Sequence, residues 1–150
     1  MADAPGPAPR IFAETELRHL LALEVQRCTR YQDFLSLCLV RADYPGAPPA
    51  EPDVAIIQRI AEMLRSTDIV GVIGPNIAVL LVHTQDSDAA VISGRIRDQI
   101  QRDTFETVPA PGRVALGIGL ASFPTDATSD GGLLTHAQAR LQAAQAPRRP

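Results

Sequence analysis

The segment from Asp68 to Val82 constrains the fold of this chain more than any other part of the sequence. It contains two apolar runs rich in β-branched residues, and Gly74-Pro75-Asn76 lies between them. Short runs of this kind indicate buried strands, and the fixed φ of proline with the left-handed tolerance of asparagine suits a tight turn. We therefore predict a β-hairpin in which both strands are buried.

Helical and strand patterns alternate on both sides of this hairpin. Apolar residues at helical spacing predict helices over residues 13–31, 54–65 and 129–144. A further helix is predicted after the hairpin, with Asp86 or Ser87 as its cap and with Val91, Ile92, Ile96 and Ile100 facing inward. Apolar runs predict further strands over residues 34–40 and 114–123, and the proline-rich segment 43–53 is expected to be a loop. This order predicts an α/β (α+β) fold, one sheet with helices packed on its faces.

The composition fits a single domain. The chain has 150 residues, 45% of them hydrophobic, which is enough for one compact core. Prolines near both ends indicate tails over residues 1–10 and 147–150, which leaves residues 11–146 as the domain. Cys28 and Cys38 share no metal-ligand spacing and are expected to be reduced thiols inside the core. With no apolar stretch long enough for a membrane span and no signal-peptide pattern at the N-terminus, we expect a cytoplasmic protein.

Charge and residue types exclude several kinds of function. The net charge of −3 argues against general nucleic-acid binding. All 14 cations are arginine, so chemistry that needs a lysine, such as a Schiff base or a P-loop, is excluded. His19, His83 and His136 show no partner at metal-ligand spacing, and we predict no metal site.

Several segments together resemble one known family. The resemblance is carried by Arg27-Cys28-Thr29-Arg30-Tyr31 before Leu35-Ser36-Leu37, the segment Leu64–Val70, the strand Ala78–Leu81 and Gly117–Pro124. In order and spacing these segments resemble the GGDEF domains, the diguanylate cyclases that join two GTP molecules into cyclic di-GMP. The resemblance covers nearly the whole ordered chain. It implies the palm-like fold of that family, a five-stranded mixed sheet flanked by helices.

The residues that the resemblance implies for catalysis are replaced. The Gly-Gly-Asp/Glu-Glu-Phe signature corresponds to Gly74-Pro75-Asn76-Ile77-Ala78, and a metal-binding aspartate of the first strand corresponds to Arg41. Phosphodiester formation from GTP needs divalent cations held by carboxylates, and an arginine in such a place repels Mg²⁺. We therefore expect a degenerate signature, no Mg²⁺ site, no cofactor and no cyclase activity.

One ligand-binding pattern of the family is retained. Arg65-Ser66-Thr67-Asp68 matches the family's Arg-x-x-Asp product-inhibition site, with Ile69 to Ile73 between it and Gly74 as the pattern requires. Arginine can bond the O6 and N7 atoms of guanine, and a carboxylate can accept from its N1–H and amino group. The resemblance assigns the family's secondary arginine, contributed by a neighbouring domain, to Arg95, with Arg97 as a substitute.

Two functions without catalysis follow. In the first, the domain is a cyclic di-GMP receptor that uses Arg65, Asp68 and Arg95. In the second, it is a ligand-free interaction or dimerisation module that uses its sheet and the helix over residues 13–31; a weak diguanylate cyclase is a distant third. Because an arginine at a helix end and an aspartate in a turn also have ordinary structural roles, the Arg-x-x-Asp pattern alone does not decide between the first two. The expected partner is a second copy of the chain or another signalling protein.

Overall fold

A computed structural model describes residues 10–43, 52–103 and 114–144. Residues 1–9 and 147–150 of the predicted tails, and residues 44–51 of the predicted loop, lie outside these described residues, whereas Arg10 of the predicted N-terminal tail is described. The elements follow in the order β1 (Ile11–Phe12), α1 (Glu14–Tyr31), β2 (Leu35–Asp43), α2 (Val54–Glu62), β3 (Ile69–Ile73), β4 (Asn76–Val82), α3 (Asp86–Arg102), β5 (Ala115–Phe123) and α4 (Asp130–Ala144). No helix in the described ranges combines the length and apolar character that a membrane span requires.

The five strands form one mixed sheet in the order β1-β3-β4-β2-β5. The predicted hairpin is confirmed, because β3 and β4 pair antiparallel from Ile69 opposite Leu80 to Ile73 opposite Asn76. The strand β2 lies in the centre and pairs antiparallel with both β4 and β5. The sheet flanked by helices and the five strands implied by the resemblance are both confirmed, although apolar patterns alone predicted only four strands.

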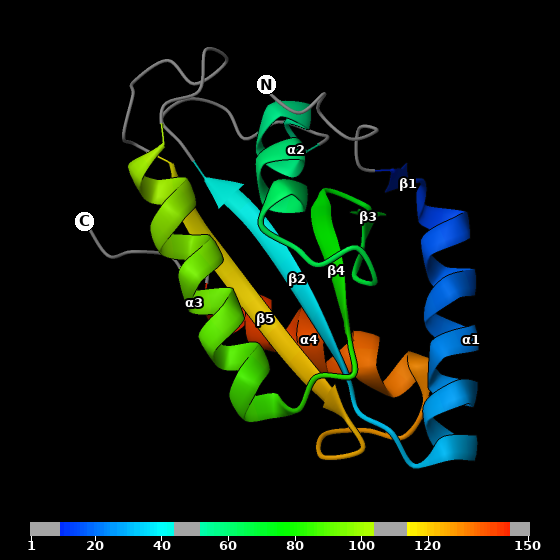
Figure 1. Cartoon of the computed structure of the whole chain (residues 1–150). Helices are drawn as coiled ribbons and strands as arrows, with labels where there is room; N and C mark the ends of the chain where they lie inside the picture. The colour runs from blue at the N-terminus through cyan, green and yellow to red at the C-terminus, as the bar shows by residue number, and fades with distance from the viewer. Residues whose placement is uncertain (1–9, 44–51, 104–113, 145–150) are drawn as a thin grey trace, which may run out of the picture.

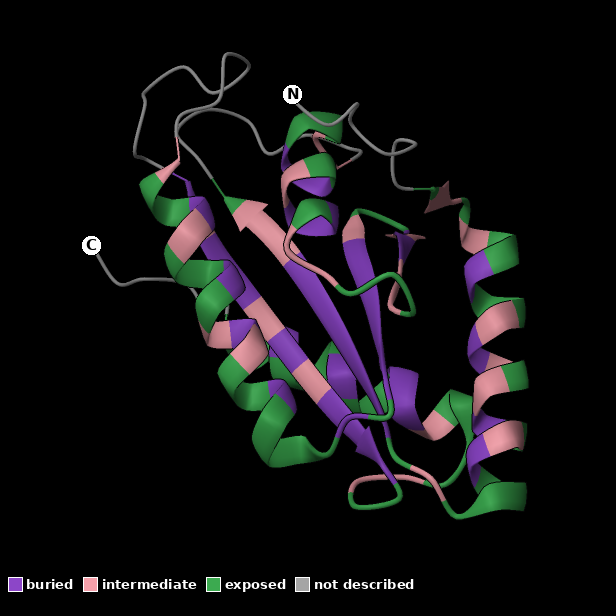
Figure 2. Cartoon of the chain, in the orientation of Figure 1, coloured by how far each residue is buried: buried purple, intermediate pink, exposed green. Residues whose placement is uncertain are grey.

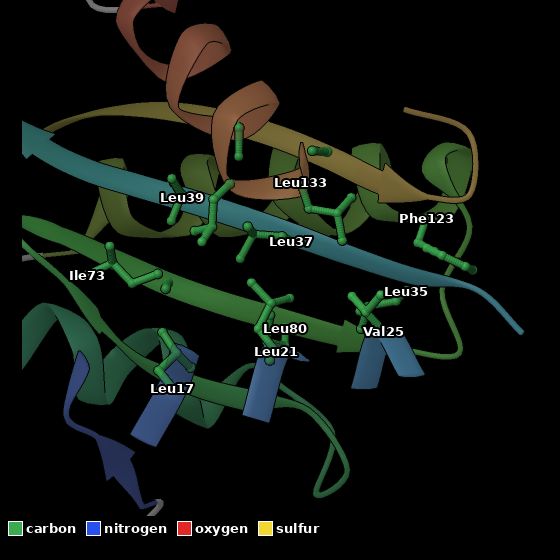
Figure 3. Close-up of a cluster of buried hydrophobic side chains, with 14 of the residues drawn as sticks. Leu17, Leu21, Val25, Leu35, Leu37, Leu39, Ile73, Leu80, Phe123 and Leu133 are labelled. Atoms are coloured by element: carbon green, nitrogen blue, oxygen red, sulfur yellow. The ribbon is translucent and has the colours of Figure 1, made fainter. Parts of the chain in front are cut away.

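Helices cover both faces of the sheet. In Figure 1, α2 and α3 lie in front of the sheet and α4 lies behind it. Alternate residues of the central strands point to opposite faces, so Cys38 and Val40 pack with α2 and α3, whereas Leu37 and Leu39 pack with α1 and α4. Figure 2 shows β2 and β4 buried over most of their length, and Figure 3 shows the cluster on the α1 and α4 side. Both cysteines are buried thiols, as predicted.

The turn of the hairpin differs from its predicted geometry. The residue with positive φ is Gly74, at 58°, whereas Asn76 is the first residue of β4 and pairs with Ile73. A positive φ followed by the negative φ that the proline ring imposes is the combination of a type II′ turn, which suits a two-residue hairpin loop. Left-handed geometry is thus supplied by glycine, for which it costs least, and the prediction that asparagine supplies it is wrong.

The helix α3 also differs in detail from its prediction. Its N-cap is Gln85, without a side-chain cap bond, so Asp86 and Ser87 lie inside the first turn. Ile96 and Ile100 are buried as predicted, but Val91 is 54% exposed. Since neighbouring helical residues are about 100° apart, a helix that buries the 89, 93, 96 and 100 positions turns position 91 outward.

Candidate ligand-binding site

Arg65 and Asp68 occupy the connection between α2 and β3. The helix α2 ends at Glu62, three residues before the predicted end, so Arg65 lies in a turn rather than in a last helical turn. The backbone N–H of Asp68 donates to the Arg65 carbonyl at 3.0 Å and closes this turn. The hairpin strand β3 begins at the next residue, so the turn is anchored directly to the sheet.

The carboxylate of Asp68 holds the turn together. Its side chain is only 2% exposed. One carboxylate oxygen, Oδ2, accepts from the backbone N–H of Arg65 at 3.0 Å and from its Nε at 3.3 Å. The other, Oδ1, accepts from Nη2 of Arg65 at 3.2 Å and from the backbone N–H of Val82 at 3.2 Å. Four donors therefore fill the acceptor directions that a carboxylate offers.

The guanidinium of Arg65 reaches from this turn to the end of β4. Its Nη2 donates to the Val82 carbonyl at 2.6 Å and to Oγ1 of Thr84 at 2.9 Å. The side chain is nevertheless 55% exposed. Arg65 and Asp68 thus have the structural role that a turn residue and its partner often have, while the outer side of the guanidinium stays open to solvent.

Arg95 lies beside this pair. An open groove with a volume of about 490 Å³ runs between the turn and α3, and Arg65, Asp68 and Arg95 all line it. Its remaining walls are Met63, Leu64, His83, Thr84, Asp88, Val91 and Ile92. We call this the α3 groove. The three residues proposed from sequence are therefore brought together within one chain, and Arg95, rather than Arg97, lines the groove.

His83 is a groove residue that the sequence did not indicate. It follows β4 with a positive φ of 54°, and its Nδ1 is paired with Oδ2 of Asp33 in the loop after α1. Asp33 also accepts from Arg27 at 2.6 Å and from the backbone N–H of Phe34 at 2.7 Å. Burial alone would raise the pKa of Asp33, but these bonds lower that pKa below its ordinary value. Because the two partners are 50 positions apart in the sequence, no local spacing rule could have found this pairing.

The signature residues lie at the other end of the hairpin. Ile77 is 1% exposed and pairs with Val40 of β2, so an apolar side chain fills the place that the resemblance gives to a metal-binding glutamate. Arg41, the next residue of β2, forms an ion pair with Asp43, with 4.0 Å between its Nε and Oδ1 of the carboxylate. Arg41, Pro75 and Asn76 line a shallow hollow with residues of α4. Among the described residues, no group of three or more His, Cys, Asp or Glu side chains is placed to hold a metal ion.

The sequence profile of the family described as "Diguanylate cyclase, GGDEF domain" matches residues 54–149. The chain belongs to this GGDEF family. The match spans both the Arg65–Asp68 turn and the signature hairpin. No curated protein matches the chain by sequence.

Solved structures of GGDEF domains share the fold. The GGDEF domain of YfiN (TpbB) from Pseudomonas aeruginosa has a TM-score of 0.77 at 19% identity, over 93% of this chain and 92% of that one. The GGDEF domain of DgcB from Caulobacter crescentus, solved in complex with c-di-GMP, has a TM-score of 0.70 at 12% identity, over 97% and 90%. The diguanylate cyclase SiaD from P. aeruginosa, solved with its activator SiaC, has a TM-score of 0.72 at 20% identity, over 93% and 56%.

Proposed function

We propose that this GGDEF domain is a non-catalytic receptor for cyclic di-GMP, with Arg65, Asp68 and Arg95 as the ligand-binding residues. The observation that carries the proposal is that these three side chains line one open groove of a single chain. Two arginines complement the phosphates, and the Arg65–Asp68 pair offers both the donors and the acceptors that a guanine edge requires. The DgcB domain, which shares the fold, was solved with this ligand.

Ligand binding requires the Arg65–Asp68 pair to exchange partners. When the Arg65 side chain turns outward to the O6 and N7 atoms of guanine, it withdraws one donor from each oxygen of Asp68. The backbone donors of Arg65 and Val82 stay in place, so each oxygen then has one free acceptor direction. Guanine presents two donors on its Watson–Crick edge, N1–H and the amino group, which match these two acceptors. Opening the internal pair lowers the apparent affinity, because only the opened form binds.

The proposal includes the loss of cyclase activity. Ile77 provides no side-chain oxygen ligand, and Pro75 provides no backbone N–H within the turn. Arg41 adds a positive charge at the position where the resemblance expects a metal-binding aspartate. The reaction needs divalent cations to neutralise the transferring phosphoryl group, so these replacements argue against turnover.

The bonds of Asp68 favour a second candidate function. A carboxylate that is 2% exposed and holds four internal donors serves the fold whether or not a ligand binds. In this candidate the domain is a ligand-free interaction module that associates with a second copy or with another signalling protein. SiaD, which shares the fold, was solved with a protein activator.

Sedimentation velocity with and without cyclic di-GMP separates the two candidates. The receptor function predicts that cyclic di-GMP binds saturably and that two copies of the chain associate only when the ligand is bound. Arg95→Ala should reduce both the binding of the ligand and the association of the chains. The matched control is Arg102→Ala, which removes an equal charge from the exposed end of the same helix at a position outside the groove. A dimer of unchanged stability with and without ligand, together with no ligand binding, supports the interaction module instead.

A further inference from the structure

The Arg65–Asp68 turn is a ridge between two grooves. The α3 groove lies on one side, and on the other side a groove of about 560 Å³ runs between the turn and β1. Arg10, Phe12, Leu64, Arg65 and Ile69 are among the residues that line this second groove, which we call the β1 groove. Arg65 and Asp68 line both grooves, so one ligand held at the ridge can extend into each of them.

Arg10 is held in place within the β1 groove while remaining open to solvent. Its Nη2 donates to Glu16 at 2.8 Å, and its guanidinium carbon lies 4.5 Å from the centre of the Phe12 ring. The side chain is nevertheless 71% exposed. A guanidinium stacked on an aromatic ring and bonded at its edge has little freedom left to lose on binding, and its outer face is a flat cationic surface.

We call Arg10 and the Phe12 ring beneath it the platform. The backbone fixes this platform relative to the Arg65–Asp68 ridge. The strand β1 pairs parallel with β3, placing Phe12 opposite Gly71, and β3 begins directly after Asp68. Gly71 permits the close approach, since a Cβ at this position would lie 2.4 Å from the Phe12 carbonyl oxygen. The Arg10–Phe12 pair and the Arg65–Asp68 turn are therefore attached to neighbouring residues of one sheet.

We propose that the β1 groove is a second nucleobase subsite, in which a base stacks on the guanidinium of Arg10. This inference rests on the receptor function proposed above, because a cyclic dinucleotide has a second base that the Arg65–Asp68 pair does not hold. The guanine at the ridge is read by its edges, whereas a stacked base is recognised by its π-face, which every base has. The ligand class is thus a cyclic dinucleotide with one obligatory guanine and one variable base.

Calorimetric titrations of the full chain with three cyclic dinucleotides test this specificity. Cyclic di-GMP contains two guanines, cyclic GMP–AMP contains one and cyclic di-AMP contains none. We expect the first two ligands to bind with affinities within about fivefold of each other, and cyclic di-AMP to bind at least about tenfold more weakly because it lacks the guanine edge.

Two variants and a matched control test the platform. Arg10→Gln keeps a donor for Glu16 but removes the cationic plane, so we expect the affinity for cyclic di-GMP to fall at least about fivefold. Phe12→Leu keeps an apolar side chain but removes the supporting ring, and it weakens binding in the same direction. The control is Arg18→Gln, because Arg18 is also an exposed arginine paired with a glutamate of α1, at 2.9 Å from Glu14.

Each outcome bears on the inference. Weaker binding by the Arg10 and Phe12 variants, with the Arg18 variant unchanged, supports the second subsite. Unchanged affinity in Arg10→Gln, or a cyclic GMP–AMP affinity more than about tenfold below that of cyclic di-GMP, overturns the subsite while the receptor function stands. If the unmodified protein binds none of the three ligands, the receptor function fails and the subsite fails with it, a result visible before any variant is made.

Discussion

Replacing Asp68 with alanine is expected to destabilise the fold more than replacing Arg65. The carboxylate is 2% exposed and accepts four hydrogen bonds, two of them from the backbone N–H groups of Arg65 and Val82. In Asp68→Ala both backbone donors lose their acceptor. A buried donor without a partner costs about 1–3 kcal/mol, and the N–H of Val82 is part-buried whereas that of Arg65 lies at the exposed end of the turn.

The expected loss in the free energy of unfolding is about 2–3 kcal/mol, most of it from the Val82 donor and the lost charge-assisted bonds. Arg65→Ala removes a side chain that is 55% exposed and opens Asp68 to water, so its cost is expected to be about 1 kcal/mol or less. Asp68→Ala is the more damaging of the two variants, because its carboxylate is buried and is the acceptor of two backbone donors.

Urea unfolding followed by circular dichroism measures these differences. The control is Asp98→Ala, which removes a carboxylate from the exposed face of α3 and should change stability by less than about 0.5 kcal/mol. If Asp68→Ala also costs less than about 0.5 kcal/mol at an unchanged denaturant slope, the bonds assigned to this carboxylate do not stabilise the turn, and the reasoning is refuted.

Three further predictions concern catalysis, the hairpin and acid stability. Incubation with GTP and Mg²⁺ or Mn²⁺ should give no cyclic di-GMP by chromatography, and Ile77→Glu should not restore it because Arg41 still opposes a second metal ligand; turnover that disappears on mutation of a carboxylate contradicts this. In thermal or urea unfolding, Gly74→Ala should lower the free energy of unfolding by about 1 kcal/mol, because the φ of Gly74 is 58°. Pro75→Gly should lower it by about 0.5–1 kcal/mol, and neither variant should change the affinity for cyclic di-GMP. Loss of ligand binding with an intact fold would instead place the hairpin in the ligand-binding site. A hydrogen bond from Arg140 lowers the pKa of Asp126 below 3.8, so the contribution of this carboxylate to the free energy of unfolding is complete above pH 3.8 and is lost as pH falls through the lowered pKa. In urea unfolding at a series of acidic pH values, Asp126→Asn should therefore lose less stability on acidification than the unmodified protein. An equal loss in both proteins contradicts this role of Asp126.

The main elements of this fold could be predicted because their apolar patterns are long. The hairpin, β2, β5 and the four helices each bury enough side chains for a period to be visible in the sequence. The strand β1 has two residues, Ile11 and Phe12, which is too short to show any alternation. It forms because Gly71 leaves room for the backbone of Phe12 against β3, a tertiary reason that no local pattern records.

The candidate site could be predicted only in part. The spacing of Arg65 and Asp68 and the position of Arg95 are visible in the sequence, and the structure places all three at one groove. The bonds that occupy Arg65 and Asp68 were not predictable, because Thr84, which accepts from Arg65, and Val82, which donates to Asp68, are brought to the turn by the pairing of β3 with β4. The same applies to the platform of the β1 groove, whose parts meet only through the parallel pairing of β1 with β3.

Isothermal titration of the purified protein with cyclic di-GMP tests the central claim most directly. The receptor predicts saturable binding by the unmodified chain. It also predicts that the affinity is lower by roughly one to two orders of magnitude in Arg65→Ala and in folded Asp68→Ala, because each variant loses the contacts to one edge of the guanine. Circular dichroism at the temperature of the titration establishes that each variant is folded. No heat and no chemical-shift change with the folded, unmodified protein at high micromolar ligand would contradict the claim.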